Sequence, residues 1–220
     1  MCISRLSSIL RLASITFCVQ LLPAILLPQE TPDGSDLPLT SRTVSGIEVG
    51  KSTLNQIKGA YGGGSIIHVK HTAQLCYIIQ SRPEVRMVLS SEDDASSHGQ
   101  TITRISLRLE DEAPTKSVPC FALSSHTIST LSGLRLGVTP REALAILGEP
   151  RSNVGNEMTF DWTITRKIST RSEHYSQWND LRDRCFAGAD PYSEINSSIL
   201  MEFKNNHAVS IEISRWVSTC

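Results

Sequence analysis

Apolar and polar residues alternate in a way that predicts several short strands in the first half of the chain. Within residues 101–109, apolar residues occupy every second position from Ile105 to Leu109, which places them on one face of an extended strand. Two apolar runs, residues 74–80 and 85–90, have the length of further strands. We therefore expect a three-stranded antiparallel meander in this part of the chain.

A short helix is predicted before these strands. Leu54, Ile57 and Tyr61 recur at helical spacing, and Ser52 stands where a helix N-cap is expected. The glycines of residues 62–64 then end the helix.

The second half of the chain predicts the same order of elements. Thr139 is the expected N-cap, Pro140 fits the first helical position, and Glu142 completes a capping box. The strands that follow are predicted at residues 158–165, 199–203 and 208–217, with a tight turn at residues 204–207 that joins the last two as a hairpin.

The stretch SGIEVGKST, residues 45–53, resembles the end of a phosphate-binding loop. That motif needs a glycine five residues before Gly50, and Ser45 stands there. The stretch SGLRLGVTP, residues 132–140, repeats the frame with Val138 in place of Lys51. What recurs is the glycine frame without the lysine, which indicates an internal duplication and not a nucleotide site.

These patterns together predict an α+β fold built from two tandem repeats. Each repeat is expected to be a short helix plus a three-stranded antiparallel meander. Repeat 1 is assigned to residues 44–118 and repeat 2 to residues 119–220, with an insertion at residues 166–198.

The N-terminal segment predicts export. In residues 1–28, Arg5 and Arg11 precede an apolar run, as in a signal peptide, and the run is short against the ~20 apolar residues of a membrane span. No small-residue cleavage motif precedes Gln29, so an uncleaved anchor is kept as an alternative. Residues 29–43 have the composition of a flexible linker. The expected location is periplasmic or extracellular.

Four cysteines remain after the predicted signal peptide: Cys76, Cys120, Cys185 and Cys220. An even number in an exported chain indicates two disulfides, for which three connectivities are open. We expect the pairings Cys76–Cys120 and Cys185–Cys220. No C-x-x-C spacing supports a zinc ribbon or a thioredoxin-like site.

Three short motifs resemble those of a known family. They are the glycine frame GLRLG of residues 133–137, the helix end LGEP of residues 147–150, and Cys76-Tyr77 in a first strand. They resemble the small α+β repeat of the SmpA/OmlA (BamE-like) outer-membrane assembly lipoproteins, and the secreted β-lactamase inhibitor protein is similar in having two such units. The similarity covers residues 46–109 and 133–217. AYGGGS replaces the LGxP ending in repeat 1, and no cysteine directly follows the signal. The resemblance implies a non-enzymatic, protein-binding module of the envelope or the extracellular space.

Candidate chemistry elsewhere in the sequence is sparse. The net charge of −1 and the lack of a basic block argue against nucleic-acid binding. His68 and His71 have no neighbouring ligand set, so we expect surface histidines, no metal and no cofactor. The acidic cluster Glu92, Asp93 and Asp94 within residues 91–99 lacks the spacing of an EF-hand. We predict no catalytic residue. The alternative is a small hydrolase that uses a histidine with an acidic residue or a cysteine, for example Cys185 with His174 or His207.

The insertion at residues 166–198 combines aromatic residues with arginines, the composition of interface hot spots. The alternative is that these aromatic residues only pack the insertion onto the domain. The residues chosen as candidate binding residues are Tyr175, Trp178, Arg182, Arg184 and Tyr192.

The sequence therefore predicts an exported, non-catalytic module that binds another envelope or extracellular protein. It would contact a membrane only if the N-terminal segment were uncleaved. A structural envelope protein held by that anchor is the remaining alternative.

Overall fold

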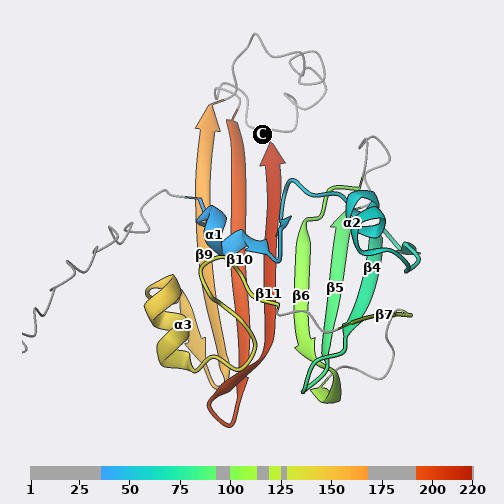
Figure 1. The fold of residues 1–220 in the computed structure, drawn as a ribbon. Helices are drawn as coiled ribbons and strands as arrows, with labels where there is room; N and C mark the ends of the chain where they lie inside the picture. Colours follow the sequence, from blue (N-terminus) through green and yellow to red (C-terminus); the bar gives the residue numbers. More distant parts are fainter. Residues whose placement is uncertain (1–35, 93–99, 113–118, 125–127, 168–191, 220) are drawn as a thin grey trace, which may run out of the picture. The chain divides into compact units, whose positions relative to one another are not determined.

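In a computed structural model, residues 36–92, 100–112, 119–124, 128–167 and 192–219 are described. Nine strands form one sheet, with the order β3-β4-β5-β6-β11-β10-β9-β8 and with β7 beside β4 (Figure 1). The strands of this sheet are β3 (Ile67–Val69), β4 (Thr72–Ile79), β5 (Val85–Glu92), β6 (Arg104–Leu109), β7 (Phe121–Leu123), β8 (Ser152–Val154), β9 (Glu157–Lys167), β10 (Tyr192–Lys204) and β11 (His207–Thr219). Every pairing in the sheet is antiparallel except that of β7 with β4.

The remaining elements are short. A two-stranded sheet pairs β1 (Thr43–Val44) with β2 (Ile47–Glu48). The helices among the described residues are α1 (Leu39–Arg42), α2 (Leu54–Tyr61), α3 (Pro140–Leu147) and a 3₁₀ turn, η1 (Glu110–Glu112).

The predicted α+β fold of two tandem repeats is therefore wrong. The structure is mostly β, and the strands of both halves belong to one sheet that is joined where β6 pairs with β11. The repeated glycine frames also differ locally, since Gly46 turns the β1–β2 hairpin whereas Gly133 lies in a turn outside any strand pair. The physical reason is that each half leaves an open strand edge, and pairing these edges satisfies backbone groups that would otherwise be exposed.

The core lies on one face of the sheet. One row of direct cross-strand partners spans six strands and is almost fully buried: Phe160, Ile199, Ile213, Ile105, Leu89 and Leu75. A continuous apolar row of this kind stabilises a single register, because a slip of one residue would turn every member to the other face.

Helices α2 and α3 pack against this face through Leu54, Ile57 and Ala143 (Figure 1). The predicted capping box of α3 is confirmed, with Thr139 and Glu142 bonded in both directions. The predicted N-cap of α2 is wrong by one residue: Thr53 is the cap, and the Ser52 hydroxyl instead accepts a bond of 2.9 Å from the Glu48 N–H.

The opposite face of the sheet is polar. Arg104 pairs with Glu212 at 3.3 Å and Arg108 with Glu202 at 3.0 Å, both across strand boundaries. Partly exposed pairs of this kind contribute little to stability. They keep the face hydrated while the other face is buried.

Two hairpin turns each have two central residues at positive φ. Ser45 and Gly46 both have positive φ, 48° and 85°, as a two-residue turn with the twist of its strands requires. The GKST stretch follows this hairpin, and the Lys51 side chain is 78% exposed beside Glu48, so no phosphate loop forms. The predicted hairpin turn between β10 and β11 is confirmed, with Asn205 and Asn206 at positive φ.

The disulfide Cys76–Cys120 is confirmed. It links β4 to the residue just before β7, which runs parallel to β4 with Phe121 opposite Tyr77. The second expected bridge, Cys185–Cys220, lies outside the described residues.

Candidate functional site

An apolar cleft of about 380 Å³ opens where β5, β6 and β11 meet residues 128–137. The side chains of Leu107, Leu109 and Val85 come from the core face of the sheet. Ile128 and Leu136, both half-buried, contribute from the covering segment. A volume of this size is in the range of small-ligand pockets, which begin at about 300 Å³.

Two backbone hydrogen bonds join the covering segment, residues 128–137, and the neighbouring Val138 to the first residues of β11. Gly137 donates to the Ala208 carbonyl at 2.8 Å, and Ala208 donates to the Val138 carbonyl at 2.9 Å. Gly137 has a φ of +85°, a conformation that glycine adopts without strain. The turn at Gly137 therefore places Leu136 over the cleft and Arg135 at its rim.

The rim of the cleft is positively charged. Arg82, Arg135 and His207 line it and are exposed, and none of its lining residues is acidic. Within the part of the chain that the structure describes, the side chains of Arg82 and Arg135 form no hydrogen bond and no ion pair. The cleft thus combines an apolar floor with unpaired guanidinium groups.

One carboxylate lies near this rim without belonging to it. The pKa of Glu142 is lowered, chiefly by hydrogen bonds from the Thr139 backbone and hydroxyl, and further by the charges of Arg135 and His207. Glu142 is bound in the α3 capping box and forms no ion pair with Arg135, although the two charges interact.

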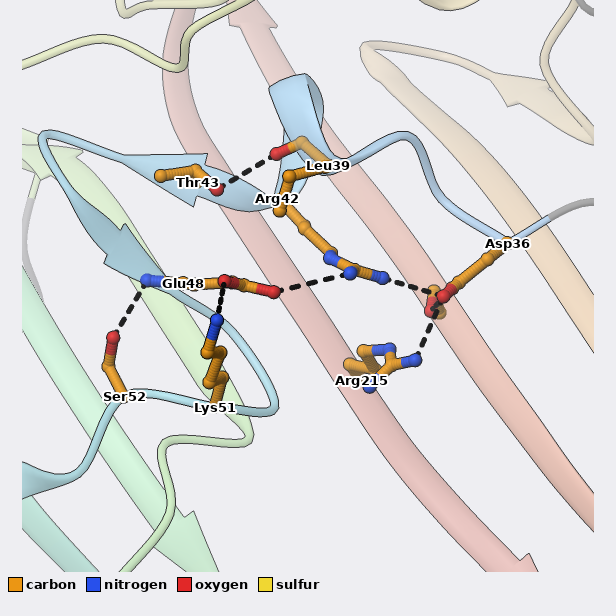
Figure 2. A network of polar contacts seen from close by, with 9 residues as sticks. Asp36, Leu39, Arg42, Thr43, Glu48, Lys51, Ser52 and Arg215 are labelled. Atoms are coloured by element: carbon orange, nitrogen blue, oxygen red, sulfur yellow. Dashed lines mark hydrogen bonds and ion pairs between the residues drawn. The ribbon is translucent and has the colours of Figure 1, made fainter.

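A second polar cluster fastens the first described residues to the sheet. Figure 2 shows the Asp36 carboxylate between the guanidinium groups of Arg42, at 2.6 Å, and Arg215, at 2.8 Å. The Ser197 hydroxyl also donates to Asp36, at 3.2 Å, and Arg42 continues the network to Glu48 at 3.2 Å. Residues of β10, β11, α1 and β2 are thereby held together.

The electrostatics of this cluster favour a charged Asp36. Burial raises the pKa of Asp36. The hydrogen bond and charge of Arg215, followed by those of Arg42, lower this pKa by more than burial raises it, so the net shift is downward. Gly50 allows this arrangement, because a Cβ there would lie 2.7 Å from a guanidinium nitrogen of Arg215. With its charges paired internally, we assign the cluster a structural role.

Most of the predicted binding residues cannot be placed. Tyr175, Trp178, Arg182 and Arg184 lie outside the described residues, as do Cys185 and His174. Tyr192 begins β10 and pairs with Lys167 of β9. The connection between these two strands is residues 168–191.

His68 and His71 lie at one edge of the sheet, on or next to β3, whereas His207 begins β11 in the interior of the sheet. His68 is exposed in β3, His71 is exposed beyond it, and His207 lies at the cleft with its Nδ1 2.8 Å from the Asn205 carbonyl oxygen. Among the residues with a described position, no group of three or more His, Cys, Asp or Glu has the arrangement of a metal site. No helix in this same set is long and apolar enough to cross a membrane.

The cleft is the feature that sequence reasoning missed. Arg135 belongs to the glycine frame GLRLG, and Arg82 lies between two predicted strands in no motif. No motif joins them, since their proximity depends on the pairing of β6 with β11. Comparison with protein-family models, with curated proteins and with solved structures finds no match.

Proposed function

We propose that the protein is an exported, non-catalytic binding protein of the bacterial envelope or the extracellular space, and that its cleft binds an apolar, negatively charged segment of a partner protein. The observation that carries this proposal is the apolar cleft with unpaired Arg82 and Arg135 at its rim.

The chemistry of the cleft suits a partner side chain as anchor. Burying one Leu or Phe side chain of a partner contributes about 1.5–3 kcal/mol, and a pocket of this kind is where binding energy concentrates in an interface. Acidic residues beside that anchor would meet Arg82, Arg135 and His207. Complementary charge raises the association rate and selects among apolar partners.

Two observations support export. The disulfide Cys76–Cys120 is of a kind that persists in oxidising compartments. Residues 1–28 have the charge and apolar pattern of a signal peptide. N-terminal sequencing of the protein recovered outside the cytoplasm tests whether the segment is removed.

The binding proposal is tested by crosslinked capture from the envelope and medium of the native host, with the full chain as bait. Arg135→Glu reverses a rim charge, and Arg141→Glu makes the same change on an exposed residue of α3 that does not line the cleft. We expect one protein to be captured by the wild type and by Arg141→Glu, and at least tenfold less by Arg135→Glu.

The same experiment separates the cleft from the insertion. Capture that is lost with Trp178→Ala and Tyr192→Ala but kept with Arg135→Glu would move the binding surface to the insertion. Capture of no specific protein by the wild type would contradict the proposed function. Circular dichroism of each variant shows that it is folded.

A further inference from the structure

The two edges of the nine-stranded sheet differ in how much of their outermost long strand is paired. The outer edge of β4 is covered near both ends, by β3 opposite Thr72–Gln74 and by β7 opposite Tyr77–Ile79. The disulfide Cys76–Cys120 fastens β7 there. At the other edge, β8 covers β9 only from Glu157 to Thr159. Within the described residues, β9 therefore has an uncovered stretch from residue 160 to residue 167.

The backbone groups that this stretch presents can be assigned. Arg151 donates its N–H to the Thr159 carbonyl, at 2.8 Å, so Thr159 points its backbone groups outward, away from β10. Because successive residues of a strand alternate in direction, Asp161, Thr163 and Thr165 also direct their N–H and C=O groups outward. The intervening residues, Trp162 and Ile164, bond to β10.

An uncovered strand edge is normally protected by charged side chains, proline, a bulge or a covering segment. In residues 160–167 the charged residues lie towards the two ends, at Asp161, Arg166 and Lys167, and residues 162–165 carry no charge. Residues 160–167 contain no proline, and their pairing with β10 runs without a register shift. Thr163 and Thr165 are exposed. Threonine and tryptophan favour strands, so the edge is suited to accept another strand.

We propose that the occupant is a second copy of this chain, which pairs its β9 antiparallel to the first and continues the sheet across a two-fold axis. The axis passes beside Ile164. Thr163 of one copy then lies opposite Thr165 of the other, and Ile164 lies opposite its own counterpart.

The extent of β8 selects this register. Moving the partner by two residues toward β8 would place its Lys167 opposite Thr159, whose carbonyl is already bonded to Arg151. Moving it the other way leaves Asp161 without a partner residue in β9. In the proposed register, Lys167 lies opposite Asp161, whose carboxylate already pairs with Arg151 at 3.2 Å. The four outward residues of each copy exchange about eight hydrogen bonds.

The first test is sedimentation of the full mature chain between about 1 and 100 μM, concentrations at which moderate protein affinities are measured. Thr163→Pro removes an outward N–H, so it costs no bond to β10, whereas Thr163→Val keeps that N–H and serves as the matched control. We expect the wild type and Thr163→Val to dimerise, and Thr163→Pro to raise the dimer dissociation constant at least about tenfold. A wild type that stays monomeric at every concentration would overturn the proposal.

The second test reports the register and does not depend on the proline variant folding. Ile164 lies in a non-hydrogen-bonded pair with its counterpart, where Cα atoms are about 4.5 Å apart, within reach of a disulfide. Ile164→Cys is expected to form a covalent dimer under mild oxidation, well above the level of the wild type. Thr163→Cys should do so only when mixed with Thr165→Cys. A dimer that forms with none of these crosslinks uses another surface and would refute the pairing of β9.

Discussion

Removing the disulfide Cys76–Cys120 should lower the free energy of unfolding by an amount that depends on the length of the loop it closes. The double variant Cys76→Ala with Cys120→Ala opens a loop of 44 residues. In the chain-entropy description, closing a loop of that length stabilises the folded state by about 4 kcal/mol. Cys76 is almost fully buried, so the loss of its sulfur adds a packing cost. We expect the free energy of unfolding to fall by at least about 3 kcal/mol, since measured values often lie below the entropic figure.

The assay is urea unfolding at 25 °C, followed by far-UV circular dichroism, with both the midpoint and the slope recorded. The slope should rise, because the unfolded chain without the bridge exposes more surface. Repeating the measurement on the double variant with reductant is the control, and a further loss of stability would reveal a second bridge such as Cys185–Cys220. A loss below about 1 kcal/mol with an unchanged slope would show that the bridge does not constrain the unfolded chain as argued.

Two further predictions concern buried polar groups. Asp36→Asn should lower the free energy of unfolding by about 2 kcal/mol at pH 7, because two guanidinium groups lose their carboxylate. The folded pKa of Asp36 lies below its ordinary value of 3.8, so its contribution is present above that pH and is lost as pH falls through the folded pKa. The difference between wild type and variant should therefore shrink as pH is lowered below 3.8, and a difference that grows or stays constant there would contradict this assignment. Tyr77→Phe should leave stability unchanged or raise it by up to about 1 kcal/mol, because the buried Tyr77 hydroxyl has no partner among the described residues. Thermal unfolding checks this, and a loss above about 1 kcal/mol would indicate a hydrogen bond that the structure does not contain.

Local features of this protein follow from its sequence. The capping box of Thr139 with Glu142 depends on residues three positions apart, and the Asn205-Asn206 turn depends on two neighbours that tolerate positive φ. The six predicted strands correspond to β4, β5, β6, β9, β10 and β11, and the strand predicted at residues 101–109 begins three residues before β6. Alternation of apolar and polar residues was sufficient for these elements because one face of the sheet is buried.

The fold and the cleft could not be predicted in the same way. The pairing of β6 with β11 brings Arg108 opposite Ser210, and no local pattern encodes a contact between such distant segments. Strands β3, β7 and β8 have three residues each and carry too few positions to show alternation. The cleft could not be predicted for the same reason, because Arg82 and Arg135 come together at its rim only when β6 pairs with β11.

The position of β11 has a consequence for the order in which the chain can fold as it is synthesised. β11 is the last of the described strands, yet it lies in the interior of the sheet between β6 and β10. While the ribosome is still making the chain, β6 has an unpaired side, and it stays so until His207–Thr219 has emerged. Long-range pairing of this kind folds slowly and leaves apolar surface open in the meantime. Until the last of the described strands pairs, the nascent protein exposes this edge, and aggregation competes with folding during that interval.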